Sequence, residues 1–214
     1  MTRVRIDLNI SLDGVASGNE TPEHPMGEDW GRLTAAYTAT RTFLERVLGD
    51  TSGSGTTGVD DSYASAYFEG IGAEIMGAAM FGLHSFPNDP NWTGWWGDQP
   101  PFRCPVYVLT HTAPREPIAF ANGTTFHFRN AAVEDVLAEA TAAAGGADVR
   151  VGGGVSTAQA FLRAGLVDQL HVAMAPVVLD RGTRLWEGAR NLDLTHKVTT
   201  EVSESGTVHV TFAR

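Results

Sequence analysis

The stretch that decides the fold is Val149-Arg-Val-Gly-Gly-Gly-Val-Ser-Thr-Ala-Gln159, in which three glycines separate an apolar strand pattern from a helix pattern. The two valines before the glycines predict a short buried strand, and Ser156 with Gln159 predicts a capping box at the start of a helix. Glycine lets the backbone approach a ligand closely, and a helix N-terminus presents free N–H groups. We therefore expect an anion site here, with a tight strand-to-helix turn as the structural alternative.

Two better-known glycine patterns do not match the chain. The run Gly152-x-Gly154-x-x-Thr157 lacks the third glycine of the dinucleotide-binding fingerprint and lies late in the sequence. The glycine-rich residues 49–62 lack the Lys-Ser/Thr ending of a phosphate-binding loop and carry Asp60 and Asp61, which would repel an anion. We interpret residues 49–62 as a loop within one domain, because the first strand needs sheet partners beyond it.

Strand and helix patterns alternate on both sides of the glycine run. Strands are expected at residues 4–10, 106–110, 124–128, 149–151 and 170–179, and a closing hairpin at 198–202 and 208–212. Residues 73–81 are apolar and are interpreted as a short strand followed by a helical turn. Helices are expected at residues 30–48, 63–72, 133–144 and 156–164, with Asn130 capping the third. The pattern predicts an α/β fold with a mostly parallel sheet and an antiparallel edge, in a single domain over residues 1–214.

Two further loops interrupt these elements, at residues 17–29 and 85–105. The second holds three tryptophans and five prolines, so it is expected to be a long irregular loop that lines a site or covers the core. Trp92, Trp95 and Trp96 are candidates for stacking on a planar substrate, with packing in the core or in a dimer as the alternative.

The composition restricts the function. The chain has 214 residues and a formal net charge of −10, which argues against nucleic acid or an anionic membrane as a partner. It shows no signal-peptide pattern and no apolar run of membrane-spanning length. Cys104 is the only cysteine, so an intramolecular disulfide is impossible, which suits the cytoplasm; we expect its thiol to be packed in the core.

Other catalytic patterns are missing from the sequence. The seven histidines show no metal-binding spacing, so no metal site is expected, and no Gly-x-Ser-x-Gly motif supports a hydrolase. Asp13 and Glu187 lie beside glycines at the ends of expected elements. Each is a candidate for contact with substrate or a simple turn residue.

Four segments together resemble the dihydrofolate-reductase-like family, in the branch of the reductase domain of bifunctional riboflavin-biosynthesis enzymes. They are residues 11–16 (SLDGVA), 106–111 (VYVLTH), 152–157 (GGGVST) and 166–188, which ends in LWEG. The resemblance implies a central sheet of about eight strands with flanking helices, and hydride transfer from NADPH, whose nicotinamide carries the reaction. A homodimer is also implied.

The resemblance assigns expected roles to residues. Asp13 is the candidate catalytic residue, and Trp30, Trp96 and Glu187 are candidates for binding substrate. The positions expected to contact the cofactor are Ala16, Gly77, Thr110, His111, Gly152, Gly153, Gly154, Val155, Ser156 and Thr157.

One segment departs from the family pattern. After the second strand the family reads Gly-Arg-x-Thr or Gly-Arg-x-Met, whereas this chain reads Gly77-Ala78-Ala79-Met80. A charge-assisted contact from the missing arginine would contribute about 1.5–3 kcal/mol to binding of the cofactor phosphates. The resemblance therefore implies an NADPH-dependent reductase of a small heterocyclic or conjugated substrate, whose cofactor binds weakly, differs in its phosphate or has been lost. The alternative is a non-redox member, a binding protein or an enzyme of other chemistry, that uses the former cofactor cleft.

Overall fold

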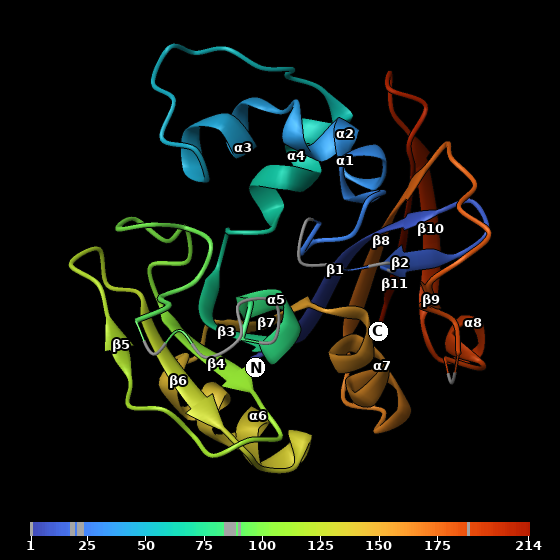
Figure 1. Ribbon diagram of the computed structural model, residues 1–214. Coiled ribbons are helices and arrows are strands. Elements are labelled where there is room, and N and C mark those ends of the chain that lie inside the picture. The colour runs from blue at the N-terminus through green and yellow to red at the C-terminus, as the bar shows by residue number, and fades with distance from the viewer. Residues whose placement is uncertain (1, 18–19, 21–23, 84–88, 90, 188) are drawn as a thin grey trace.

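The computed structural model describes residues 2–17, 20, 24–83, 89, 91–187 and 189–214. Parts of the two expected loops at 17–29 and 85–105, and Gly188, lie outside the described residues. Within the described part, a nine-stranded sheet has the order β10-β11-β8-β1-β7-β3-β4-β6-β5 (Figure 1). Its strands are β1 (Val4–Ser11), β3 (Ile71–Gly77), β4 (Pro105–Leu109), β5 (Ile118–Ala119), β6 (Thr125–Arg129), β7 (Asp148–Gly153), β8 (Gln169–Ala175), β10 (Lys197–Val202) and β11 (Val208–Ala213).

The centre of this sheet is parallel and its edges are antiparallel. Strands β8, β1, β7, β3, β4 and β6 pair in parallel, while the β10–β11 hairpin and β5 close the two edges in antiparallel fashion. The expected mostly parallel sheet and the C-terminal hairpin are therefore confirmed. A separate two-stranded sheet pairs β2 (Val15–Ser17) with β9 (Thr183–Arg184).

Helices cover both faces of the sheet (Figure 1). Helices α6 (Val133–Ala143) and α7 (Val155–Arg163) pack on one face of the sheet. They bury a hydrophobic cluster that includes Ile6, Val151 and Phe161, and we call it the larger hydrophobic cluster. On the other face lie the short helices α1 (Trp30–Leu33), α2 (Ala35–Thr38), α3 (Arg41–Arg46) and α4 (Val59–Ala66), and the single turn α5 (Ala78–Phe81). The last short helix, α8 (Leu192–Thr195), precedes β10. No helix in the described ranges is long and apolar enough to cross a membrane.

Both sides of β1 are buried. Its apolar side chains, such as Ile6 and Ile10, face the larger hydrophobic cluster, as a period-two strand requires. Its charged side chains Arg5 and Asp7 are also buried, at 6% exposure each, because α4 and its neighbours cover the opposite face. The fold therefore places charge in its interior.

The expected helix at residues 30–48 is wrong, because three short helices replace it. The hydroxyl of Thr34 donates to the carbonyl of Trp30, and Thr40 adopts an extended conformation and caps α3 by accepting from the N–H of Phe43. Threonines that bond the local backbone compete with helix continuation. The next expected helix, at 63–72, begins earlier, at Val59, inside the expected loop, and ends at Ala66.

Two expected helix caps are also wrong. Helix α6 begins after Ala132, while the side-chain amide of Asn130 donates to the carbonyl of His111. Helix α7 begins directly after Gly154, so Ser156 lies inside its first turn. Gln159 instead donates to the carbonyl of Arg184, which ties α7 to β9.

Candidate active site

The sheet opens between β1 and β7 at its carboxyl edge. The pairing of β1 with β7 ends at Ile6 and Val151, whereas the pairing of β1 with β8 continues to Ser11 and Ala175. The carboxyl ends of β1 and β7 therefore diverge. In open α/β sheets, ligands bind outside the carboxyl ends of the strands where the chain connections diverge, so this opening is the candidate active site.

The glycine turn, defined as residues 152–154, lies at this opening. A Cβ built on Gly153 would lie 3.3 Å from Sδ of Met80 and 3.6 Å from Cδ2 of Leu8, so the turn runs between α5 and β1. A Cβ on Gly154 would meet nothing within 4 Å. Gly154 immediately precedes α7, whose first N–H groups lack acceptors within the helix. The backbone is therefore open to a ligand at Gly154.

The ends of β3 and β4 complete this edge. A Cβ on Gly77 would lie 2.5 Å from Oγ1 of Thr157 in α7, and Gly77 pairs with Leu109, the residue before Thr110. The structure thus brings together most of the expected cofactor positions: Gly77, Thr110, Gly152, Gly153, Gly154 and Thr157. Ser156 is exposed on the first turn of α7, and His111 is exposed beyond β4.

The side chain of Val155 differs from its neighbours because it is buried in the core at 4% exposure. Only the backbone of this residue faces the turn. Ala78 is also buried, at 7% exposure, at the start of α5.

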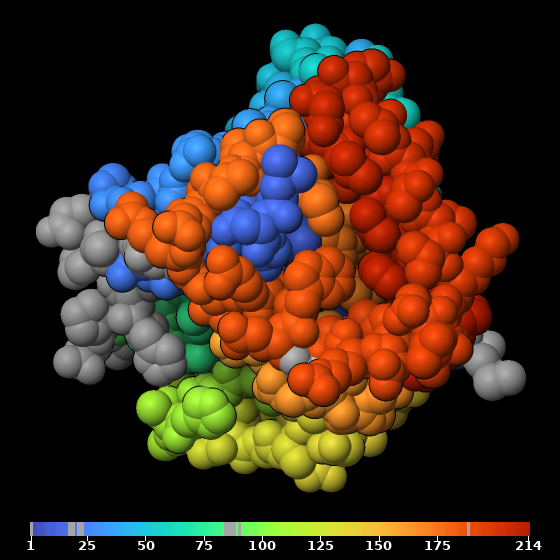
Figure 2. Space-filling model, turned by 90° about the vertical axis from the view of Figure 1, so that its right-hand side faces the viewer, coloured from blue at the N-terminus to red at the C-terminus, as the bar shows by residue number. Residues whose placement is uncertain are grey.

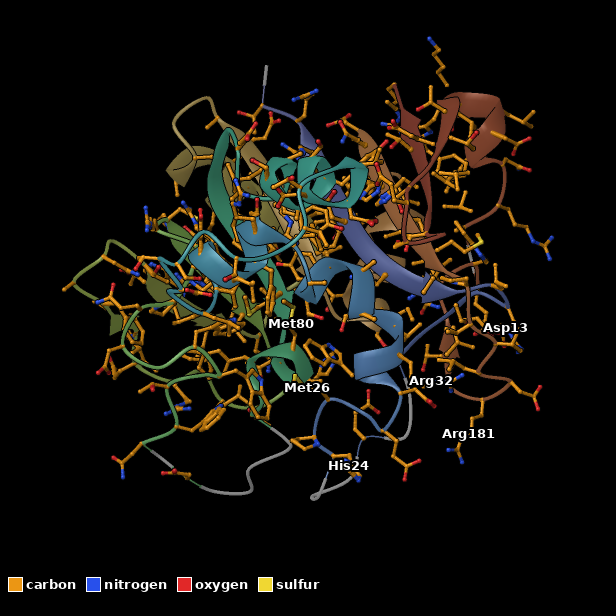
Figure 3. The ribbon with its side chains drawn as sticks, turned by 90° about the horizontal axis from the view of Figure 1, so that it is seen from above. Asp13, His24, Met26, Arg32, Met80 and Arg181 are labelled. Carbon is orange, nitrogen blue, oxygen red and sulfur yellow. The ribbon has the colours of Figure 1, made fainter. Side chains whose placement is uncertain are left out.

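Asp13 lies apart from the glycine turn. Its carboxylate accepts from the hydroxyl of Ser11 at 2.6 Å and from the backbone N–H groups of Leu179 and Asp180 at 3.1 and 2.9 Å. These hydrogen bonds lower the pKa of Asp13 to about 2. Figure 3 shows Asp13 near the right-hand edge of the molecule and Met80 near its middle. The contacts of Asp13 are those of a turn residue, and its catalytic role remains a prediction.

Ala16 and Glu187 belong to the same side of the molecule as Asp13. Ala16 lies in β2 and is half-buried against the larger cluster, and Glu187 is exposed after β9. Figure 2 shows the turn after β1, in blue, surrounded by the segment after β8, in orange. The N–H of Leu185 donates to the carbonyl of Gly14, which fastens the two together.

The expected substrate tryptophans differ in their surroundings. Trp96 is half-buried and packs in the core, with its ring centroid 5.8 Å from that of Phe126 and 4.9 Å from that of Phe102. Its neighbours Trp92 and Trp95 donate from Nε1 to the carbonyls of Phe81 and Met80. These contacts are those of core packing, and the stacking of Trp96 on a substrate stays a prediction. Trp30 is half-buried at the start of α1.

A buried cluster of charged side chains was not expected from the sequence. Nε of Arg150 donates to Asp7 at 3.1 Å, and Nη1 of Arg150 donates to Glu74 at 3.0 Å. Nδ1 of His171 lies 3.4 Å from Oδ1 of Asp7. These four residues come from β7, β1, β3 and β8, and each is at most 7% exposed. Four adjacent strands are therefore joined by charge under α4.

Burial and pairing act on these groups in opposite directions. Burial raises the pKa of Glu74 to about 7, against the charges of Arg150 and Arg5. Burial also raises the pKa of Asp7, but its contact with His171 and the charge of Arg150 outweigh this effect, and its pKa is lowered. The surroundings of Asp7 therefore favour its charged form, whereas burial favours the neutral form of Glu74.

A sequence signal for this cluster exists in hindsight. Glu74 is the one charged residue in the apolar stretch of residues 71–83, and Arg150 stands between two buried valines. Charged residues are almost never fully buried unless they are paired. An acidic residue in one apolar strand and a basic residue in another therefore predict that the two side chains form a buried ion pair.

Comparison with known proteins places this chain in a family. The family model of the RibD C-terminal domain matches residues 2–209. The chain belongs to this family, and the dihydrofolate-reductase-like fold expected from its sequence is confirmed. Among curated proteins, no sequence matches the chain.

Solved structures show the same fold at low sequence identity. A riboflavin biosynthesis protein from Shewanella sp. PV-4 is 20% identical with a TM-score of 0.61, covering 100% of this chain and 99% of that one. A pyrimidine reductase-like protein from Corynebacterium diphtheriae is 12% identical with a TM-score of 0.53, covering 99% and 91%. RibD from Acinetobacter baumannii is 15% identical with a TM-score of 0.52, and the match spans 58% of its length.

Proposed function

We propose that this protein is an NADPH-dependent reductase that transfers hydride to a small heterocyclic or conjugated substrate. The observation that carries the proposal is the open backbone at Gly154, before the nine-residue helix α7 and beside the opening between β1 and β7. Membership in the RibD C-terminal domain family supports it, as does the fold shared with a pyrimidine reductase-like protein.

The residues at the glycine turn fit the phosphates of such a cofactor. The N–H groups at the start of α7 can donate to phosphate oxygens, and the helix N-terminus favours negative charge. The hydroxyls of Thr157 and Ser156 are further donors within the same turn of α7. When bound, NADPH would supply the hydride. The side chains of Met80 and Leu8 beside Gly153 would exclude water from the turn.

The substrate would bind on the α1 side of the opening. The candidates for contact with it are Asp13, Trp30, Trp96 and Glu187. We also propose a homodimer in the cytoplasm, where the buried Cys104 stays reduced. Light scattering at micromolar concentration tests the dimer, and a mass of 22.8 kDa, that of one chain, would contradict it.

Titration with NADPH, followed by its fluorescence, tests the proposed cofactor. Gly154→Val introduces a side chain into open space and should weaken binding by about 10-fold or more, because it blocks approach to the backbone. Thr141→Val, on the exposed side of α6, is the matched control and should bind as the wild type does. Equal affinity in a folded Gly154→Val variant would contradict the site.

The second candidate function is a non-redox one. Ala78 favours it, because this buried side chain makes no charged contact with a phosphate. In that case the wild type would not bind NADPH at any concentration up to the millimolar range. Binding of NADPH that Gly154→Val weakens would exclude this alternative.

A further inference from the structure

We propose that Glu74 is a positioning residue for the glycine turn: its carboxylate, held by Arg150, fixes the bulge at which the turn leaves β7. The inference deepens the proposed function and rests on it for the effect on the cofactor. The geometric part concerns this chain alone and can be tested without a ligand.

The bulge is visible in the register of β3 and β7. Glu74 pairs with Arg150 and Ile75 pairs with Val151, but Met76 pairs with Gly153. Gly152 is therefore the extra residue on β7. A bulge of this kind redirects a strand, and here it marks the start of the glycine turn.

The carboxylate of Glu74 fills the space above Gly152. A Cβ built on Gly152 would collide with Oε1 of Glu74 and would lie 3.4 Å from Nη1 of Arg150. The ion pair between these two side chains therefore packs directly against the backbone of Gly152. This contact explains why residue 152 has no side chain, independently of any ligand.

Arg150 holds the carboxylate in this place. Its guanidinium bonds Asp7 through Nε and Glu74 through Nη1, so it is fixed from both neighbouring strands. The ring of Tyr67, the residue directly after α4, lies 5.1 Å from its Cζ and covers it. Two bonds from different nitrogens leave the planar guanidinium little freedom to turn, so Glu74 is held rigidly.

The charge of Glu74 changes near neutral pH, which supplies a test. Its pKa is about 7 because of burial, with Arg150 acting in the opposite direction. Protonation removes the negative charge of the ion pair, so the guanidinium of Arg150 then donates to a neutral carboxyl group, which it holds less strongly than a carboxylate. Several titratable or charged groups surround Glu74. The sheet contributes Arg5 and Asp7 from β1, Arg150 from β7 and His171 from β8. The covering segments contribute Tyr37 from α2, Tyr67 directly after α4 and Cys104 directly before β4.

Hydrogen exchange of the ligand-free protein measures the turn directly. Glu74→Gln keeps the volume and one acceptor but removes the charge. The protection factors of the amides at residues 151–153, at the end of β7, should fall by about 5-fold at pH 8, because the guanidinium of Arg150 binds a neutral amide less strongly than a carboxylate. Glu139→Gln makes the same change on α6, where Glu139 pairs with the partly exposed Arg129, and should leave the turn unchanged.

The wild type provides a second measurement that needs no variant. Its protection at residues 151–153 should fall as the pH is lowered from 8 to 6, because Glu74 becomes protonated. Glu74→Gln should lack this dependence. Protection that is flat with pH in the wild type, or unchanged in a folded Glu74→Gln variant, overturns the proposal.

The affinity for NADPH at pH 8 separates this inference from the proposed function. If the wild type binds, Glu74→Gln should raise the dissociation constant by about 5-fold, in line with the loosened turn. Unchanged affinity would overturn the positioning role. If the wild type does not bind NADPH, the proposed function fails, while the exchange measurements still decide whether Glu74 positions the turn.

Discussion

Nε2 of His171 in β8 lies 3.0 Å from Nδ1 of His209 in β11, and the pair stands between two carboxylates. Nε2 of His209 lies 2.9 Å from Oδ1 of Asp60, at the start of α4. The ring of Tyr63 stacks on both imidazoles, with centroids 4.4 and 4.0 Å away. The two histidines therefore connect α4 to the sheet. They link the buried carboxylate of Asp7 in β1 to the carboxylate of Asp60 at the start of α4.

The first prediction concerns the pH dependence of this attachment. Burial lowers the pKa of His209 below the ordinary value of 6.5, ahead of the opposing effect of Asp60. Between these two pKa values the unfolded chain binds more protons at this histidine than the folded one, so His209 contributes a loss of stability as the pH falls below about 6.5. His209→Gln should remove this loss. It should also lower the free energy of unfolding at pH 7.5 by about 2 kcal/mol, because buried hydrogen bonds are lost.

Urea unfolding at pH 5.5 and 7.5 measures both effects. His111→Gln is the control, because His111 is an exposed histidine outside the cluster, and it should keep the dependence of the wild type. An unchanged difference in stability between the two pH values in His209→Gln would contradict the assignment.

Much of the fold could be predicted from sequence because strands show period two and glycines mark their ends. Residues 149–159 gave both the strand and the following helix, and residues 198–212 gave the hairpin. The single helix at residues 30–48 failed for a local reason. The spacing of apolar residues predicts that they share one face of a helix. It does not show that the side chains of Thr34 and Thr40 form hydrogen bonds with the backbone and interrupt the helix.

The candidate site was predictable only where glycine reveals a backbone constraint. A Cβ at Gly77, Gly152 or Gly153 would meet a side chain of another segment, and a Cβ at Gly154 would meet nothing within 4 Å. Each glycine therefore marks a close approach or an exposed stretch of backbone. Met80 could not be found this way, because its place beside Gly153 depends on how α5 packs. The charged cluster was missed because alternating polar residues in β1 look like a solvent-facing side. Which side of a strand is covered depends on distant segments, here α4.

The second prediction separates the two possible roles of Asp13. In Asp13→Asn an amide nitrogen replaces one carboxylate oxygen, so either Leu179 or Asp180 loses its acceptor. The pKa of Asp13 is lowered to about 2, so its contribution to stability is present above the ordinary value of 3.8 and is lost as the pH falls toward 2. We expect a lower melting temperature at pH 7 and a weaker dependence on acid below pH 4.

Thermal unfolding across this pH range measures the effect, and Asp98→Asn, at an exposed aspartate, is the control. A melting temperature equal to that of the wild type would contradict the structural role. Lower turnover in such an unperturbed variant would instead support the catalytic role of Asp13.

The third prediction compares adjacent glycines of the turn. Gly153 has φ = +131°, which L residues rarely adopt, and its Cβ would lie 3.3 Å from Sδ of Met80. Gly154 has φ = −71° and open space. Gly153→Ala should therefore lower the free energy of unfolding by about 1–3 kcal/mol. Gly154→Ala should change it by less than about 1 kcal/mol. Urea unfolding of both variants decides this, and equal stabilities would show that the turn relaxes around Gly153.

The last prediction tests the cation that the family pattern places after Gly77. Ala78→Arg should tighten NADPH binding by about 10-fold, from a charge-assisted contact reduced by the entropy of ordering the side chain. Because Ala78 is buried at 7% exposure, the variant should also lose about 1–3 kcal/mol of stability through overpacking. Ala79→Arg is the matched control, since it adds the same charge at the exposed next residue.

Calorimetric titration with NADPH and NADH at two salt concentrations reads out the contact. The gain should shrink at high salt, because partly exposed charges are screened. A gain restricted to NADPH would place the guanidinium at the 2′-phosphate, and an equal gain for both cofactors would place it at the pyrophosphate. If Ala79→Arg matches Ala78→Arg, the effect is the general one of net charge rather than a specific contact. If a folded Ala78→Arg variant binds neither cofactor better, this edge of the sheet does not hold the phosphates, and the non-redox alternative becomes the better account of the glycine turn.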